Sequence, residues 1–384
     1  MSAECIAIDV TRLAARALAG RRPTGVDRVG LEYVTHFGAA ARALVRHRGR
    51  WIQFGARQSQ ALFALLRANE PRGIRSVVAA GYALHWRRRR GALLLNTGHS
   101  GLDAASYADA VRRLSLRPLY FLHDLIPLTH PEYCRPGEAT KHRQRLLTML
   151  HTGAGLIVNS QATATDLRRW AATESVQIPP LVVAPIGTVT LPVVAGAAPL
   201  DVPYFVVLGT VEARKNHLLL LHVWRRMAER GLAELPKLVI IGQRGWECEQ
   251  VIDLLERCEA LRGHVIEVGD CDDAQLANWL RHARALLFPS FTEGYGMPLP
   301  EALSVGLPVI ASDLAVFREI AGDIPDYLDP LDGPAWQRAV LDYARPESAA
   351  RAAQLERMRG YAAPTWEQHF EIVDAFVASI AGTP

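Results

Sequence analysis

The sequence predicts an α/β protein with two Rossmann-like, doubly wound parallel-sheet domains that face one another across a cleft. Two observations lead to this fold class: the chain has 384 residues, and short apolar runs alternate with helix-period segments along it. Such a chain is too long for one ordinary core and fits two domains of roughly 190 residues each. Apolar strands that alternate with helices are typical of parallel sheets covered on both faces.

The first half supplies the strands and helices of one sheet. Apolar runs predict strands at residues 5–10, 93–98, 119–124, 155–160 and 181–187. The segments between them predict helices that start near Val26, Ala104, Glu138 and Thr163. Short apolar runs bounded by turn residues are the pattern of buried strands. Residues 1–190 are therefore expected to form an N-terminal Rossmann-like domain.

The second half repeats the pattern after a break. Residues 191–203 are rich in Pro, Gly and Ala and lack a period, which indicates a linker. Residues 204–362 are expected to form the C-terminal Rossmann-like domain, and residues 363–384 to end the chain in an amphipathic helix. The strands of this half are predicted at residues 204–210, 237–242, 264–269, 285–290 and 307–313.

The two halves carry opposite net charge. Residues 1–190 hold 26 Lys+Arg and 12 Asp+Glu, and residues 191–384 hold 17 and 27, which gives +14 and −10. A basic half attracts an anionic partner, such as a phospholipid surface, a lipid-linked diphosphate or nucleic acid. No apolar run approaches the ~18 residues of a membrane span. The N-terminus lacks a secretory pattern, and the five scattered cysteines favour reduced thiols in the cytoplasm.

Two carboxylates stand close together in the stretch FPSFTEGYGMPLPEALSVGLPVIASD, residues 288–313. Glu293 and Glu301 have seven residues between them. Glu293 follows a predicted strand on a glycine-containing loop, and Pro298 suits the first turn of a helix that would carry Glu301. The backbone N–H groups around Gly294 and Gly296, beside a helix N-terminus, suit an anion such as a phosphate. Two acids that flank such a site indicate a receptor for a sugar–diphosphate–ribose ligand, because carboxylates accept hydrogen bonds from neighbouring hydroxyls.

This stretch resembles the E-x7-E motif of retaining glycosyltransferases of family 4, which have the GT-B fold. The surrounding FPS-x-x-EG-x-G-x-P-x-x-EA pattern and the segment 205–221 are similar to the same family. Residues 121–133 and 156–167 resemble its bacterial mannosyltransferase branch, which builds O-antigens and exopolysaccharides. The resemblance implies that the C-terminal domain binds a nucleotide sugar and that residues 1–190 bind the acceptor. In this fold the terminal helix, residues 363–384, crosses back to the N-terminal domain.

Arg214 and Lys215 follow the predicted strand 204–210. They are expected to project from its carboxyl end and to neutralise a diphosphate leaving group, since preorganised charge is a strong catalytic lever. By resemblance, Glu301 holds the ribose diol and Glu293 the donor sugar hydroxyls. The predicted catalytic residues are His123, Glu293, Arg214 and Lys215. The predicted donor-binding residues are Glu301, Glu293, Gly294, Tyr295, Gly296, Met297, Arg214, Lys215, Gly25, Gly209 and Thr210.

Further candidates lie in the first half. His123 and Asp124 end the strand 119–124, and the family's equivalent histidine contacts the donor sugar. His99 also follows a strand and is a weaker candidate. Gly25 would bring backbone amides near phosphate or acceptor, although many family members carry two glycines where this chain has Thr24 and Gly25. The cluster HWRRRRG, residues 85–91, combines Trp86 with Arg87–Arg90 and fits either an anionic membrane surface or a solvated charge run.

The sequence therefore predicts a retaining hexosyltransferase of bacterial surface polysaccharide biosynthesis. It would move mannose from GDP-mannose to a hydroxyl of a glycan or lipid-linked oligosaccharide, in the cytoplasm or at the inner face of the membrane. No metal or other cofactor is expected, and no nucleic-acid partner. Other donors (UDP-glucose, UDP-GlcNAc, a deoxysugar), a GT-B epimerase or phosphorylase, and a non-catalytic binding subunit that uses the basic half remain open, as do the acceptor, the linkage and the oligomeric state.

Overall fold

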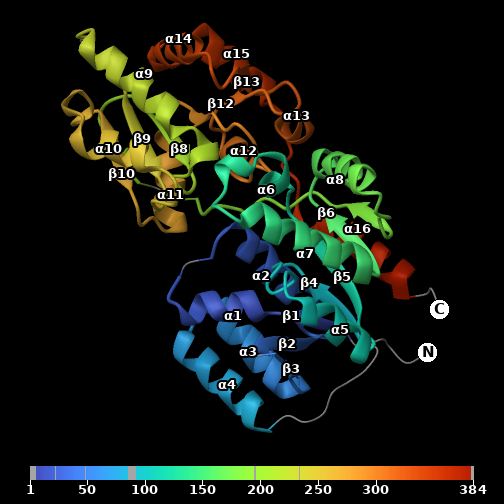
Figure 1. The fold of residues 1–384 in the computed structure, drawn as a ribbon. Helices are drawn as coiled ribbons and strands as arrows, with labels where there is room; N and C mark the ends of the chain where they lie inside the picture. The colour runs from blue at the N-terminus through green and yellow to red at the C-terminus, as the bar shows by residue number, and fades with distance from the viewer. Residues whose placement is uncertain are drawn as a thin grey trace. The chain divides into compact units, whose positions relative to one another are not determined.

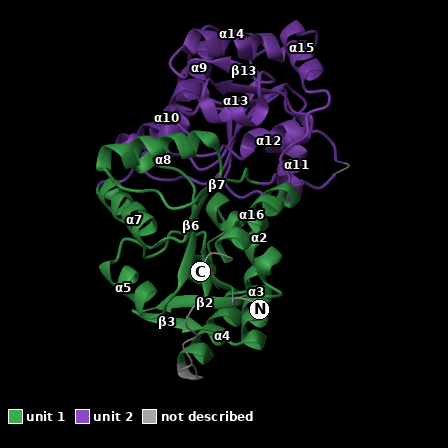
Figure 2. Ribbon diagram, turned by 90° about the vertical axis from the view of Figure 1, so that its right-hand side faces the viewer, with its two compact units in different colours: residues 1–128, 137–186, 366–384 green, residues 129–136, 187–365 purple. Residues whose placement is uncertain are grey.

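The structure, a computed structural model, describes residues 6–21, 23–47, 49–84, 92–193, 196–232 and 234–381 (Figure 1). The chain divides into two compact units (Figure 2). Unit 1 comprises residues 1–128, 137–186 and 366–384, and unit 2 comprises residues 129–136 and 187–365. The basic cluster at residues 85–91 lies outside the described residues.

Unit 1 is built on a seven-stranded sheet with strand order β3-β2-β1-β4-β5-β6-β7. Neighbouring strands are parallel, except that β2 pairs with β3 in antiparallel register. The strands are β1 (Ile6–Asp9), β2 (Arg42–His47), β3 (Arg50–Gln53), β4 (Leu93–Asn96), β5 (Arg117–Leu122), β6 (Gly155–Val158) and β7 (Leu181–Val183). The pair β2–β3 is an addition to the predicted strands, and it extends the sheet beyond β1.

The helices of unit 1 connect these strands (Figure 1). They are α1 (Thr11–Leu18), α2 (Gly25–Phe37), α3 (Ala56–Arg67), α4 (Pro71–Leu84), α5 (Ala105–Arg113), α6 (Ile126–Thr129), α7 (Glu138–Thr152), α8 (Gln161–Glu174) and α16 (Trp366–Ala381). The last helix belongs to unit 1 although it ends the chain. Its buried His369 lies 3.1 Å from the Tyr33 hydroxyl and 2.9 Å from the Pro185 carbonyl oxygen.

Unit 2 is built on a six-stranded, fully parallel sheet with strand order β10-β9-β8-β11-β12-β13. Its strands are β8 (Tyr204–Leu208), β9 (Lys237–Ile241), β10 (Val265–Val268), β11 (Leu286–Phe288), β12 (Val309–Ser312) and β13 (Asp326–Leu328). Its helices are α9 (His217–Glu229), α10 (Glu249–Arg257), α11 (Asp273–His282), α12 (Pro298–Ser304), α13 (Ala315–Ala321), α14 (Gly333–Ala344) and α15 (Ala349–Arg357), with short turns η1 (Pro131–Tyr133), η2 (Ala213–Lys215) and η3 (Glu259–Leu261).

A separate apolar core stabilises each sheet. In unit 2, Trp224 of α9 and Trp336 of α14 are fully buried against strand residues such as Phe205. In unit 1, Tyr107 and Tyr120 lie within the main apolar cluster. Burying each large apolar side chain contributes on the order of 1.5–3 kcal/mol, so these cores hold the strand ends, and the loops that follow them, in fixed positions.

Among the helices that the structure describes, none combines the length and apolar character that crossing a lipid bilayer requires.

Candidate functional site

The candidate site of unit 2 forms where two neighbouring parallel strands end. Strand β8 pairs with β11 through Val206 and Leu286. Parallel strands bring their carboxyl ends to the same edge, which is where ligands of open α/β sheets bind. The loop after β8 leads through η2 into α9, and the loop after β11 leads into α12. The backbone N–H of Phe291 donates to the carbonyl of Arg214 at 2.8 Å, which ties the two loops together.

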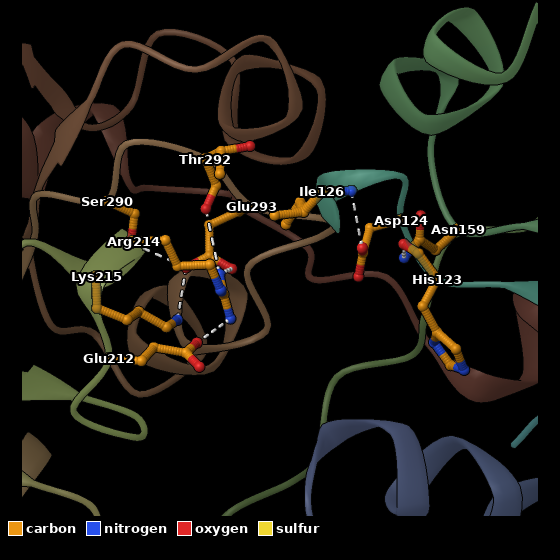
Figure 3. A network of polar contacts seen from close by, with 10 residues as sticks. All are labelled: His123, Asp124, Ile126, Asn159, Glu212, Arg214, Lys215, Ser290, Thr292 and Glu293. Atoms are coloured by element: carbon orange, nitrogen blue, oxygen red, sulfur yellow. Dashed lines mark hydrogen bonds and ion pairs between the residues drawn. The ribbon is translucent and has the colours of Figure 1, made fainter. Parts of the chain in front are cut away.

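Glu293 is the centre of a buried charge network (Figure 3). Its Oε2 accepts a hydrogen bond from Arg214 Nη1 at 2.6 Å, and its Oε1 accepts one from Lys215 Nζ at 2.5 Å. Ser290 Oγ donates to the same Oε1 at 2.9 Å. The side chains of Glu293 and Lys215 are only 5% and 8% exposed. The structure therefore brings together three residues that the sequence predicts for one site.

A second carboxylate completes this network. Glu212 Oε1 lies 2.6 Å from Arg214 Nη2, so Arg214 stands between two acids, as Figure 3 shows. Lys215 Nζ also lies 4.8 Å from the centre of the Phe288 ring, a cation–π distance. We name Glu212, Arg214, Lys215 and Glu293 the charge cluster. Its two cations and two acids cancel in formal charge, which allows Glu212, Lys215 and Glu293 to be buried while Arg214 keeps 22% of its side chain exposed.

Burial and pairing act in opposite directions on these groups. Burial raises the pKa of Glu293, but Arg214 and Lys215 outweigh it and lower that pKa to about 2. Burial raises the pKa of Glu212, only partly offset by the same two cations. Burial lowers the pKa of Lys215, against the opposing effect of Glu293. At neutral pH Glu293 is therefore ionised and holds both cations by charge-assisted hydrogen bonds.

Glycines allow the backbone to approach closely at this edge. A Cβ on Gly242, which follows β9, would lie 2.1 Å from the carbonyl oxygen of Gly209. Gly209 has φ +126° and packs beside the Lys215 side chain. Gly296 has φ +90°, and a Cβ there would lie 2.4 Å from the ring of Phe317. Gly242 and Gly296 require glycine because a side chain would meet backbone or a ring, and Gly209 requires it because of its positive φ.

The other residues predicted in this region lie on the same loop and helix. Tyr295 is buried, Met297 stands at the N-cap of α12, and its carbonyl accepts the Glu301 N–H at 3.2 Å. Glu301 lies in the first turn of α12 and is buried. Gly294 lies between Glu293 and Tyr295 and is partly exposed, and Thr210 directly follows Gly209. The helix at Pro298 and the glycine loop before it thus form as the sequence predicts.

His123 lies in unit 1, at the end of β5. Its Nε2 is 2.8 Å from the carbonyl oxygen of Thr97, and Asn159 Nδ2 donates to its backbone carbonyl at 2.8 Å. Asp124 accepts the N–H of Ile126 at 3.0 Å and so caps the start of α6 (Figure 3). Burial lowers the pKa of His123, which outweighs the opposing effects of the hydrogen bond to Thr97 and of the charge on Asp124. Since a carbonyl only accepts, Nε2 carries the proton and the ring is held as a neutral imidazole.

His99 and His142 surround the same position. The rings of His99 and His123 are 5.1 Å apart, and those of His99 and His142 are 6.3 Å apart. Burial lowers the pKa of His99 well below its ordinary value, and the neighbouring His123 and His142 lower it further. We name these three residues the histidine cluster. His142 lies on α7 and was not singled out from the sequence.

Gly25 is the first residue of α2, and it is exposed. The preceding Thr24 is the N-cap, and its N–H and hydroxyl donate to Asp27 at 2.7 and 2.6 Å. Asp27 is fully buried and lies within 2.8 Å of Arg12 Nε and 2.7 Å of Arg16 Nε. The conformation at Gly25 is therefore fixed by a helix cap that also binds two arginines.

Two members of the network in unit 2, Glu212 and Ser290, are not predicted from the sequence. Glu212 stands two residues before Arg214, and Ser290 ends the run that contains β11. A signal was present, because both lie in the two strand-end loops that already held candidates. Spacing alone does not reveal that Glu212 pairs with Arg214, or that Ser290 donates to Glu293. Among the described residues, no group of three or more His, Cys, Asp or Glu side chains forms a metal site.

The charge cluster falls within a family match. Residues 194–324 match the family described as "Glycosyl transferases group 1", a stretch that contains Glu212, Arg214, Lys215, Glu293 and Glu301. The chain therefore carries a glycosyltransferase group 1 domain, as the resemblance implied.

The chain is also similar to bacterial mannosyltransferases. It is 28% identical over 244 residues to "Serotype-specific mannosyltransferase WbdA" of Escherichia coli, a match that covers 59% of this chain and 29% of WbdA. It is 31% identical over 164 residues to "O-antigen chain mannosyltransferase B" of Escherichia coli, covering 43% of this chain and 42% of that protein. The match thus spans less than half the length of each of these relatives.

A solved structure shows the same fold. The chain resembles HepE of Anabaena, crystallised with UDP and glucose, with a TM-score of 0.67 and 14% sequence identity, over 98% of this chain and 100% of HepE. Together with the two α/β units, this likeness confirms the predicted GT-B fold. The cleft between the two domains stays a prediction.

Proposed function

We propose that this chain is a retaining glycosyltransferase of family 4 that transfers mannose from GDP-mannose to a hydroxyl of a glycan or lipid-linked oligosaccharide. The similarity to WbdA and to O-antigen chain mannosyltransferase B supports a mannosyl donor and a role in bacterial surface polysaccharide biosynthesis. The proposed location is the cytoplasm or the inner face of the membrane. We propose no metal cofactor.

The observation that carries the proposal is the contact of Glu293 with Arg214 and Lys215 at the common edge of β8 and β11. Glu293 and Glu212 neutralise the two cations. A diphosphate would compete with these carboxylates for Arg214 and Lys215. Glu293 released in this exchange would accept hydrogen bonds from the donor sugar, and Glu301 would accept them from the ribose.

In the transfer step, the largest change in charge occurs on the leaving diphosphate. The bond between the sugar C1 and the diphosphate oxygen breaks, and the acceptor oxygen forms a new bond to C1 on the same face. Attack on that face retains the configuration at C1, and the acceptor proton passes to the departing diphosphate oxygen, which balances the charges. Arg214 and Lys215 would stabilise the negative charge on that oxygen, and His123 would contact the donor sugar near the reacting centre.

One observation favours a second donor. HepE is bound to UDP and glucose in its structure, and its fold extends over nearly the whole chain. UDP-glucose is therefore the first alternative to GDP-mannose. UDP-GlcNAc and a deoxysugar nucleotide follow.

A donor screen tests the proposal. The purified chain is incubated separately with GDP-mannose, UDP-glucose, UDP-GlcNAc and a deoxysugar nucleotide, and release of the nucleoside diphosphate is measured with and without an oligomannose acceptor. We expect turnover of GDP-mannose that depends on acceptor, and an α-linked product by NMR. Turnover of another donor would move the assignment to that sugar. Absence of turnover with every donor, together with salt-sensitive oligonucleotide binding, would favour a non-catalytic binding subunit.

A further inference from the structure

Unit 1 contains a basic pocket that the proposed donor chemistry does not use. It is a cavity of about 410 Å³ lined by Arg12, Arg16, Arg21, His99 and Arg145, with small residues between them. Three structural elements supply these side chains: α1 and the turn after it, the loop after β4, and α7. The loop after β4 lies at the carboxyl edge of the unit 1 sheet, where ligands of open α/β sheets bind.

One buried carboxylate holds two of these arginines from behind. Asp27 lies near the Nε atoms of Arg12 and Arg16, at 2.8 and 2.7 Å. Nε is the guanidinium nitrogen closest to the backbone, so these contacts fix the side chains at the base of the guanidinium. Arg12 and Arg16 keep 34% and 23% of their side-chain surface exposed, whereas Asp27 keeps 1%. The acid is therefore hidden behind the cations that line the pocket.

Arg145 on α7 is also paired with acids, but these are partly exposed and the shorter contact is to a terminal nitrogen. Its Nη1 donates to Glu138 at 2.5 Å, and its Nε lies 3.7 Å from Asp103. Neither acid belongs to the lining of the pocket. Arg21 follows α1 and is exposed. The lining thus presents four guanidinium groups, and no carboxylate is among the residues that line it.

The arginines that line the basic pocket favour an oxyanion as its ligand. A pocket for a neutral sugar is usually built with carboxylates or amides that bind hydroxyls and with aromatic rings that stack on the sugar, and here the lining offers cations. Planar guanidinium groups bind phosphate oxygens in bidentate fashion. The volume exceeds that of a single phosphate and lies in the range of pockets for small organic ligands, roughly 300–1,000 Å³. The space therefore fits a phosphate or diphosphate with a further group attached.

We propose that this pocket binds a phosphate or diphosphate ester of the acceptor substrate. The assignment to the acceptor rests on the proposed function, whereas the binding of an oxyanion rests on the pocket alone. The shared chemistry has two sources: the diphosphate of a lipid-linked glycan, and a phosphorylated sugar residue within a glycan. In both cases the arginines bind the anionic group and so determine which end of the acceptor lies in the pocket.

Direct binding measurements test the pocket. Titration calorimetry with inorganic diphosphate is done on the full chain that carries Lys215→Ala, so that binding at the charge cluster is weakened from the start. Into this background we introduce Arg21→Gln and, separately, Arg145→Gln. Both replace a lining cation and leave the buried Asp27 paired. Arg57→Gln, an exposed position on α3, is the matched control.

We expect Arg21→Gln and Arg145→Gln each to weaken diphosphate binding about tenfold, because each removes a charge-assisted hydrogen-bond donor. Arg57→Gln should stay within about twofold of its parent. If both lining variants keep the affinity of the parent, the pocket is not an oxyanion site. Since inorganic diphosphate needs no donor, failure of the donor screen leaves this measurement intact.

Three further ligands distinguish the sources. Tighter binding of farnesyl diphosphate than of inorganic diphosphate supports the lipid-linked source. Tighter binding of mannose 1-phosphate than of inorganic phosphate supports the phosphorylated glycan. Tighter binding of GDP than of inorganic diphosphate, lost in Arg21→Gln, would overturn the assignment to the acceptor and give the pocket to the donor.

Discussion

The charge cluster of unit 2 and the basic pocket of unit 1 use the same residue types in opposite arrangements. In the charge cluster, the terminal nitrogens of Arg214 and Lys215 contact Glu212 and Glu293. In the basic pocket, Asp27 contacts Arg12 and Arg16 at Nε. In the charge cluster the acids are paired with the terminal nitrogens that a diphosphate would also contact, so we expect a ligand to compete with them. In the basic pocket Asp27 lies behind Arg12 and Arg16 and is only 1% exposed. The proposed leaving-group site and the proposed anion pocket thus differ in where the buried acid stands relative to the cations.

The largest effect is expected from removing Lys215, the buried cation of the charge cluster. Lys215→Ala should lower turnover of the donor by about 10²–10³-fold, because it removes one preorganised contact to the leaving diphosphate. Steady-state kinetics with the donor found in the screen would measure this change. Arg225→Ala, an exposed position on α9 paired with Glu229, is the control and should keep wild-type turnover. Unchanged turnover in Lys215→Ala would mean that the leaving diphosphate does not lie beside Lys215.

Glu293→Gln tests what the acid contributes to unit 2. The fold lowers the Glu293 pKa from the ordinary 4.5 to about 2, which corresponds to about 3 kcal/mol of folding free energy at neutral pH. A depressed carboxyl pKa stabilises the folded state above the unfolded pKa and loses this contribution as the pH falls through the folded pKa. The stability difference between wild type and variant should therefore shrink between pH 4.5 and 2.

Urea unfolding of both chains across that pH range measures the difference, with Glu229→Gln on the exposed face of α9 as control. A difference that is equally large at pH 2.5 and at pH 7 would mean that the Glu293 carboxylate is not the origin of the stability.

His369→Gln tests how the titration of a buried histidine in unit 1 affects stability. Burial lowers the His369 pKa from 6.5 to about 4, which outweighs the opposing hydrogen bonds to Pro185 and Ala184. The unfolded chain therefore takes up a proton below about pH 6.5 that the folded chain refuses until about pH 4. Stability falls over this window by about 2 to 3 kcal/mol. Glutamine does not titrate, so the variant should lose less stability between pH 6.5 and 4.

Urea unfolding of wild type and His369→Gln at pH 7, 6, 5 and 4 measures this dependence. His222→Gln, an exposed position on α9, is the matched control. Parallel pH profiles for wild type and His369→Gln would contradict the prediction.

The smallest effect is expected from removing one acid of the charge cluster, which makes it more like the basic pocket. Glu212→Gln removes one acid from Arg214 and leaves the cluster with a net positive charge. Nucleoside diphosphate binding should tighten by roughly three- to tenfold, since one charged competitor is lost. Calorimetry with GDP and UDP measures the change, and Glu256→Gln, an exposed position paired with Arg244, is the control. Weaker binding in Glu212→Gln would mean that Glu212 mainly orients Arg214.

Much of the fold follows from the sequence because buried parallel strands are almost wholly apolar. Strands β8 to β12 lie within the five runs predicted for the second half. Helices expected near Val26 and Ala104 begin at Gly25 and Ala105. The strands β2 and β3 were missed because RALVRH and RWIQ mix charges with apolar residues, and β13 was missed because its three residues, DYL, begin with an acid and leave only two that are apolar or aromatic. Charged edge strands and very short strands give little periodic signal.

The candidate site was predictable where function follows from position at a strand end. Arg214, Lys215 and Glu293 were found because each lies directly after a predicted strand, and parallel strands share one edge. Glu212 and Ser290 were missed because their roles depend on which atoms meet, and the sequence does not contain that distance. His142 comes from the middle of α7, so its place beside His99 depends on how that helix packs. The basic pocket likewise gathers residues from three distant segments.

The buried Asp27 in the first turn of α2 has a consequence for temperature. Asp27 accepts the Thr24 N–H and also contacts both arginines of α1, so one carboxylate holds the first turn of a helix and two arginines that line the basic pocket. Helix ends fray before helix centres. If the basic pocket binds anions as proposed, mild warming that loosens this turn should release Arg12 and Arg16 together, and the affinity for anions should decline well below the temperature at which the molecule melts.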